Sequence, residues 1–97
     1  MAKYVTLYKF TAQGIRDIKS SPERIKQATA AWEAMGGKLL AIYSTQGPYD
    51  LVAISEADDD EMGAAFALKM GSLGNVTTLT MRAFDTEEYA RIISKIP

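Results

Sequence analysis

The sequence contains no cysteine and no histidine, and these two absences exclude most familiar catalytic chemistry. Without cysteine the chain has no disulfide framework, no thiolate metal ligand and no cysteine nucleophile. Without histidine it lacks the commonest general base and the commonest zinc ligand. We therefore expect no metal site and no cofactor, and proton transfer would depend on carboxylates or tyrosines.

An excess of charge of one sign is also missing, because 11 basic residues stand against 12 acidic ones. This balance offers no bulk attraction to phosphate backbones or to anionic membranes, so we expect neither nucleic acid nor membrane as a partner. The longest apolar runs, such as Leu39–Tyr43, are too short to span a bilayer, and the first residues lack the apolar core of a signal peptide. These features favour a cytoplasmic protein.

The composition that remains is that of one globular domain. With 97 residues, of which 47% are hydrophobic and 24% are charged, the chain has room for a single core, so we expect residues 1–97 to form one domain. Alternating β-branched, aromatic and polar residues predict four strands, at 3–10, 38–46, 50–56 and 75–84.

Capping residues and helical spacing predict three helices. The first begins at Ser21-Pro22-Glu23 and ends at Gly36-Gly37, because serine can cap a helix and proline tolerates its first turn. The second follows the acids at 58–61, which we interpret as helix-capping residues because they lack the spacing of a calcium loop. A short terminal helix follows Asp85.

The resulting order is βαββαβ plus a C-terminal helix, which is typical of an α+β ferredoxin-like sandwich. Right-handed crossovers and a hairpin between the middle strands favour an antiparallel sheet in the spatial order 4-1-3-2, with both long helices on one face. We expect that covered face to hold Val5, Leu7, Val52, Ile54, Leu79 and Met81.

The opposite face of the sheet would then be open. By alternation it carries Tyr4, Tyr8, Phe10, Tyr43, Leu51, Ala53 and Phe84, over roughly 400–450 Å². An apolar patch of this size seldom stays exposed on a soluble monomer, so we expect a partner surface to cover it.

Five short stretches resemble the GYD-domain family, whose members are similar to the dimeric α/β-barrel superfamily. They are Phe10-Thr-Ala-Gln-Gly-Ile-Arg16, Gly36-Gly37-Lys38, Gly47-Pro48-Tyr49-Asp50, Ala64-Ala-Phe-Ala-Leu68 and Gly71-Ser-Leu-Gly-Asn75. The resemblance implies a homodimer, or a larger homo-oligomer, in which two sheets pack face to face to form a dimeric α/β barrel. It implies no particular activity.

Strand directions bring three loops, at 11–21, 46–50 and 71–75, to one end of the sheet. Glycines there permit close backbone approach, and amides at a helix N-terminus favour an anion. We therefore predict a site for a small acidic or aromatic organic molecule. Its polar residues are Gln13, Arg16, Tyr49, Asp50, Ser72 and Asn75, and its apolar floor is formed by Tyr8 and Phe10.

Two interpretations of Gly47-Pro48-Tyr49-Asp50 remain open. As a simple turn, in which Asp50 bonds local amides, it fits a non-catalytic binding module. As a catalytic pair, Asp50 acts as base and Tyr49 as hydrogen-bond donor in a cofactor-free isomerase or oxygenase. Single-stranded RNA binding on the tyrosines of the open face has less support, because the sequence lacks a basic groove and an RNP1-like stretch.

Overall fold

Four strands form one antiparallel sheet in the computed structural model, which describes all of residues 1–97. They are β1 (Ala2–Phe10), β2 (Lys38–Ser44), β3 (Leu51–Ala57) and β4 (Val76–Ala83). Their spatial order is β2-β3-β1-β4, which confirms the predicted ferredoxin-like topology. β-branched and aromatic residues are frequent in these strands, in keeping with their preference for a pleated, half-buried surface.

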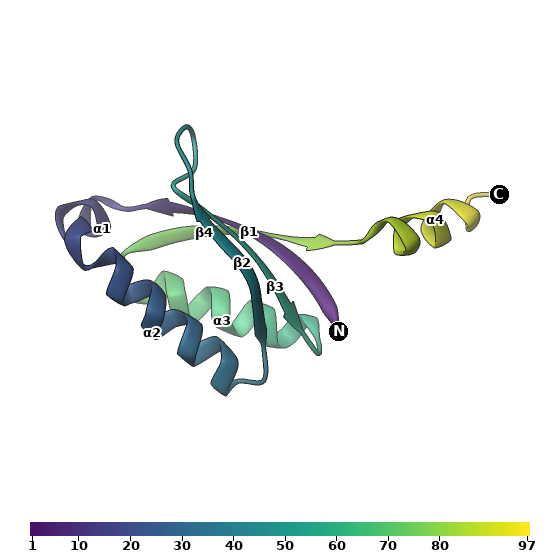
Figure 1. Ribbon diagram of the computed structural model, residues 1–97, viewed down its shortest axis with the longest axis horizontal. Coiled ribbons are helices and arrows are strands. Elements are labelled where there is room, and N and C mark those ends of the chain that lie inside the picture. Colours follow the sequence, from purple (N-terminus) through teal and green to yellow (C-terminus); the bar gives the residue numbers. More distant parts are fainter.

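The two long helices, α2 (Ser21–Ala34) and α3 (Asp60–Ser72), both lie on one face of this sheet (Figure 1). A third helix, α4 (Thr86–Ser94), follows β4 as predicted. Two further elements, α1 (Ala12–Arg16) and the 3-10 turn η1 (Ile18–Ser20), occupy a segment that we expected to be a loop.

Acidic residues cap the later helices, as predicted. Asp59 caps α3 by accepting a hydrogen bond from the Met62 N–H at 2.8 Å. Asp85 forms a reciprocal capping box with Glu88 at the start of α4. The prediction that Ser21 caps α2 is wrong by one residue: η1 runs directly into the helix, so Ser20 takes the capping position, without a side-chain bond.

Apart from Tyr43, the sheet faces are the reverse of those predicted. Tyr4, Thr6, Leu51 and Ala53 are buried on the helix side, where Tyr8 and Phe10 line the space beneath the helices. The open face is formed instead by the aliphatic set Val5, Leu7, Val52, Ile54, Leu79 and Met81, which the strand registers place opposite one another. Tyr43 lies on this face as predicted, because it pairs with Val52 after a register shift in β2. Alternation along a strand determines which residues share a face, but not which face the helices cover.

Aromatic packing explains this choice of face. Tyr4, Trp32 and Ala57 form the buried core cluster, and the Phe66 ring of α3 lies 5.0 Å from the Trp32 ring. The Tyr4 hydroxyl donates a hydrogen bond to the Asp60 carboxylate at the start of α3. A tyrosine on this face can therefore bury its ring against the helices and still satisfy its polar tip, as buried tyrosines generally do.

Helix α4 stands apart from the rest of the molecule. Figure 1 shows it beyond the end of the sheet, where it continues the direction of β4. None of its residues is buried, and its apolar side chains are largely exposed: 60% for Tyr89, 46% for Ile93 and, just past its end, 65% for Ile96. The protein therefore carries an amphipathic helix that its own fold does not cover.

Candidate functional site

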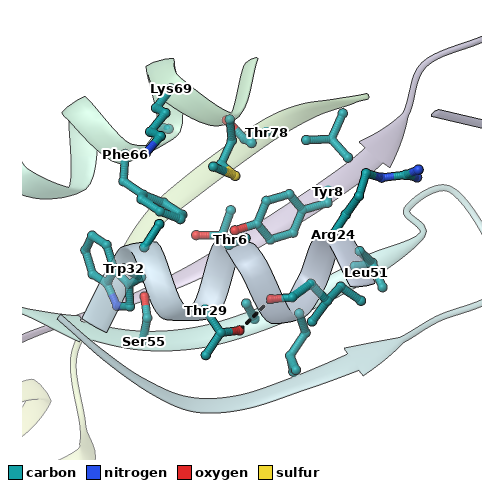
Figure 2. A pocket seen from close by; sticks show the side chains of 18 of the residues that line it. Thr6, Tyr8, Arg24, Thr29, Trp32, Leu51, Ser55, Phe66, Lys69 and Thr78 are labelled. Atoms are coloured by element: carbon teal, nitrogen blue, oxygen red, sulfur yellow. Dashed lines mark hydrogen bonds between the residues drawn. The ribbon is translucent and has the colours of Figure 1, made fainter. Parts of the chain in front are cut away.

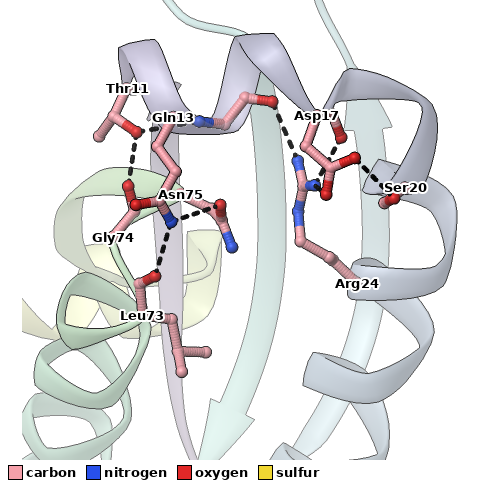
Figure 3. A network of polar contacts seen from close by, with 9 residues as sticks. Thr11, Gln13, Asp17, Ser20, Arg24, Leu73, Gly74 and Asn75 are labelled. Carbon is pink, nitrogen blue, oxygen red and sulfur yellow. Dashed lines mark hydrogen bonds and ion pairs between the residues drawn. The ribbon is translucent and has the colours of Figure 1, made fainter.

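Two of the three predicted loops meet at the junction between α1 and the turn before β4 (Figure 3). The Gln13 side-chain nitrogen donates to the Leu73 carbonyl at 3.1 Å and to Asn75 Oδ1 at 3.0 Å. Thr11 Oγ1 donates to the Gly74 carbonyl at 2.5 Å. The backbones approach so closely that a Cβ on Gly14 would lie 2.1 Å from the Asn75 carbonyl oxygen.

Asp50 ties the third loop to the end of β1. Its Oδ2 accepts a hydrogen bond from the Phe10 N–H at 2.7 Å, and its own N–H donates to the Tyr8 carbonyl at 2.8 Å. The carboxylate thus bonds an amide of the neighbouring strand, rather than one within its own turn. This contact gives Asp50 a structural role, because it satisfies a backbone donor just beyond the last β1–β3 pair.

The remaining polar residues of the predicted site do not join this network. Ser72 donates to the Lys69 carbonyl within the last turn of α3, at 2.7 Å. Arg16 is exposed, and Tyr49 is half-buried with its carbonyl accepting from Thr45 Oγ1 at 2.7 Å. The structure thus links Gln13 with Asn75 and anchors Asp50 on Phe10, while Arg16, Tyr49 and Ser72 lie outside these contacts.

Arg24, which was not predicted, joins α1 to α2. Its guanidinium lies 3.5 Å from the Asp17 carboxylate and donates to the Gly14 carbonyl at 3.3 Å (Figure 3). Asp17 and Arg24 are seven residues apart and lie on either side of a helix start. A spacing of seven residues predicts a contact only if the backbone between them is known, and here it contains the 3-10 turn η1. No pattern in the sequence therefore indicated this pair.

A cavity of about 460 Å³ lies between the two long helices and the sheet (Figure 2). More than half of its lining residues are hydrophobic, and Tyr8, Phe10 and Asn75 of the predicted site are among them. The sequence interpretation missed this cavity because it placed Tyr8 and Phe10 on the open face. Hydroxyl groups also line it, from Thr6, Tyr8, Ser55, Thr78 and Thr80.

Burial affects the hydrogen bonding and the pKa values of the polar groups around this cavity. The Trp32 Nε1 donor is buried and has no hydrogen-bond partner. Burial also raises the pKa of the Tyr8 hydroxyl, which is therefore a neutral donor. Burial and the hydrogen bond to Asp60 raise the pKa of Tyr4 to about 12. The cavity thus offers neutral hydrogen-bonding groups among apolar walls.

The fold places this chain among the α+β ferredoxin-like proteins, and solved structures agree. The crystal structure of FFRP-DM1 superposes with a TM-score of 0.63 at 21% identity, over 87% of this chain and 100% of that one. The crystal structure of TTHA0845 from Thermus thermophilus gives a TM-score of 0.57 at 25% identity, over 89% and 96% of the two chains.

Within that fold the chain belongs to the GYD domain family, whose family model matches residues 4–93. A relative from Thermus thermophilus is 34% identical over 84 residues, which cover 86% of this chain and 88% of the relative. That protein is named glutamine synthetase and cystathionine beta-lyase binding protein. These matches confirm the resemblance that the sequence motifs suggested.

No helix of this chain combines the length and the apolar character needed to cross a membrane.

Proposed function

We propose that this protein is a non-catalytic protein-binding module that forms a homodimer and docks onto metabolic enzymes. The observation that carries the proposal is the presence of two apolar surfaces that its own fold leaves uncovered, the open sheet face and α4. The relative at 34% identity, which is named as a binding protein for two enzymes, supports the same class of function.

The open sheet face is assigned to the homodimer. It is mainly aliphatic, with Leu79 and Met81 46% and 43% exposed on it and Tyr43 63% exposed. Two such faces can stack at about 10 Å and interdigitate their side chains, as in other sheet-on-sheet packings. Large contiguous apolar patches on a protein surface usually mark sites of interaction with another molecule. A larger homo-oligomer would need surfaces in addition to this face.

Helix α4 is assigned to the enzyme partner. It lies beyond the ends of the strands, so a second sheet stacked on the open face does not have to cover it (Figure 1). Its capping box stabilises it without packing from the body of the protein. An amphipathic helix held in this way matches the common mode in which an apolar helix face enters a groove on a partner.

The test measures binding of the full-length protein to purified glutamine synthetase and cystathionine beta-lyase by biolayer interferometry. Ile93→Glu places a charge on the apolar stripe of α4, and we expect it to weaken binding at least tenfold. Ala90→Glu introduces the same residue away from that stripe and serves as the matched control. We expect the control to bind within about twofold of the wild type, since single exposed charges contribute little.

Sedimentation of the same variants separates the two assignments. We expect Ile93→Glu to remain a dimer, because the sheet face is intact. If Ile93→Glu instead becomes monomeric, α4 belongs to the dimer interface and its assignment to the enzyme is wrong. Absence of binding to both enzymes, or equal loss in both variants, contradicts the proposed function.

Small-molecule binding is a second candidate function, and one observation favours it: three residues of the predicted site line the cavity under the helices. Catalysis by Asp50 and Tyr49 stays a prediction. The contact that the structure gives the Asp50 carboxylate is the backbone N–H of Phe10.

A further inference from the structure

We propose that the cavity between α2, α3 and the sheet binds a neutral aromatic molecule that carries a hydrogen-bond acceptor, such as an aromatic ketone. This inference concerns a surface different from the open sheet face and α4. It therefore stands or falls independently of the protein-binding function.

The size of the cavity fits a small organic ligand. Its volume of about 460 Å³ lies within the range of roughly 300–1,000 Å³ that is typical of small-molecule pockets. The sheet forms its floor, and residues of both long helices form its walls (Figure 2). A ligand in this cavity would contact the sheet and both helices, which removes part of its surface from water.

The arrangement of rings favours an aromatic ligand. Trp32 of α2 and Phe66 of α3 pack at 5.0 Å with an interplanar angle of 59°. Figure 2 shows this pair at one end of the cavity, with the Tyr8 ring near its middle. Aromatic rings prefer offset or tilted arrangements at such separations. The ring of a ligand could therefore pack against the Trp32–Phe66 pair in the space beside Tyr8.

The polar groups favour a ligand with an acceptor. The Tyr8 hydroxyl lines the cavity and is a neutral donor, because burial raises its pKa. The Trp32 Nε1 is buried without a partner, but Gly37 packs against this edge of the indole and leaves no room for a ligand atom beside it. A carbonyl oxygen on the ligand would therefore accept a hydrogen bond from the Tyr8 hydroxyl.

The charges around the cavity favour a neutral ligand. Arg24 lines one end, but its guanidinium is already paired with Asp17. Lys69 also lines the cavity and is exposed, so its attraction for an anion is weakened by water. A carboxylate would have to leave water without gaining a buried cation, which is unfavourable.

The chain itself supplies the probe, because Trp32 is its one tryptophan and gives one indole N–H signal in a ¹⁵N-¹H spectrum. The full-length protein is titrated with 2-acetylnaphthalene, naphthalene and 2-naphthoate. We expect saturable binding of the ketone with a shift of the indole proton signal, because the ligand ring would lie next to the Trp32 ring. We expect naphthalene, which lacks the acceptor, to bind about five- to tenfold more weakly. Naphthoate should bind more weakly than the ketone.

Two matched variants test the location. Ala28 of α2 lines the cavity and Ala30 of the same helix is exposed, so Ala28→Phe fills the cavity and Ala30→Phe does not. We expect Ala28→Phe to weaken ketone binding at least tenfold and Ala30→Phe to leave it within about twofold. Tyr8→Phe should remove the preference for the ketone over naphthalene, measured by ligand-observed NMR.

The wild-type titration decides the proposal even if Ala28→Phe does not fold. Absence of saturable binding for all three probes overturns it. Equal affinity for ketone and naphthalene, or tighter binding of naphthoate, shows that the ligand class is wrong. Unchanged binding in a folded Ala28→Phe variant shows that the site lies elsewhere.

Discussion

Asp50 shows how a single side chain can complete a sheet. Its carboxylate accepts the Phe10 N–H at 2.7 Å, and its amide donates to the Tyr8 carbonyl. A charged acceptor makes a stronger hydrogen bond to a backbone donor than a neutral one does. The residue that the sequence marks as most suited to catalysis is therefore engaged in holding β1 to the hairpin between β2 and β3.

We expect Asp50→Ala to lower the free energy of unfolding by about 1–2 kcal/mol, because it leaves the Phe10 N–H without its acceptor. Asp50→Asn keeps an oxygen acceptor and should lose less than half of that amount. Urea unfolding followed by circular dichroism measures both. If Asp50→Ala is as stable as the wild type, the hydrogen bond does not stabilise the fold and a role in chemistry gains weight.

Tyr4 makes the stability of the fold depend on pH in the alkaline range. Its folded pKa of about 12 exceeds the 10.0 of an unperturbed tyrosine, because burial and the hydrogen bond to Asp60 favour the neutral hydroxyl. Below pH 10 both folded and unfolded states keep the proton, so the stabilisation is complete there. Above it the unfolded state loses the proton first, so stability falls as the pH approaches the folded pKa of about 12.

We expect Tyr4→Phe to reduce this alkaline loss, measured by urea unfolding at a series of pH values. The exposed Tyr89 provides the control, since Tyr89→Phe should leave the pH dependence unchanged. An equally steep fall in Tyr4→Phe would assign the alkaline loss of stability to other groups.

At the scale of elements, the most closely fitted contact joins α1 to the turn before β4. Gln13, Thr11 and Asn75 bond across it, and Gly14 permits the approach because it has no Cβ. The hydrogen bond from the Thr11 N–H to the Asn75 carbonyl, at 3.1 Å, ties the two backbones together directly. This junction holds the end of β1 next to the start of β4.

We expect Gly14→Ala to destabilise the protein by about 1–3 kcal/mol, because its Cβ would lie 2.1 Å from the Asn75 carbonyl oxygen. Gly71→Ala is the matched control, since a Cβ there meets nothing within 4 Å inside helix α3. Alanine has the higher helix propensity, so the control should be as stable as the wild type or more so by up to about 1 kcal/mol. Thermal unfolding compares them, and equal behaviour of the two variants would contradict the close contact.

At the scale of the whole molecule, the helices occupy one face of the sheet and leave an aliphatic face without cover (Figure 1). The proposed homodimer follows from that asymmetry. The strand registers place Val5, Leu7, Val52, Ile54, Leu79 and Met81 together on this face, and none of them is charged. A single charge inserted among these residues therefore tests whether the face is buried in a homodimer.

We expect Leu79→Lys to weaken self-association at least about 100-fold, because each interface would bury two unpaired like charges. Leu68→Lys makes the same change on α3, where the leucine is 75% exposed and away from the sheet. The control should dimerise as the wild type does. Sedimentation equilibrium measures both, and a wild type that stays monomeric at high concentration would contradict the homodimer.

The sequence by itself determined the elements and their order. Alternation and capping residues located four strands and three helices, because these signals are local and depend on neighbouring residues only. Right-handed crossovers then left one favoured strand order, and the structure has it. The meeting of the loops that contain Gln13 and Asn75 also followed from strand directions.

Only the tertiary structure decided which face of the sheet the helices cover. A strand offers two faces related by a shift of one residue, and both faces of this sheet are apolar enough to be buried. The choice depends on how Tyr4 fits against Trp32 and reaches Asp60, which are 28 and 56 residues away along the chain. The same long-range packing creates the cavity and leaves α4 uncovered, and no local pattern contains that information.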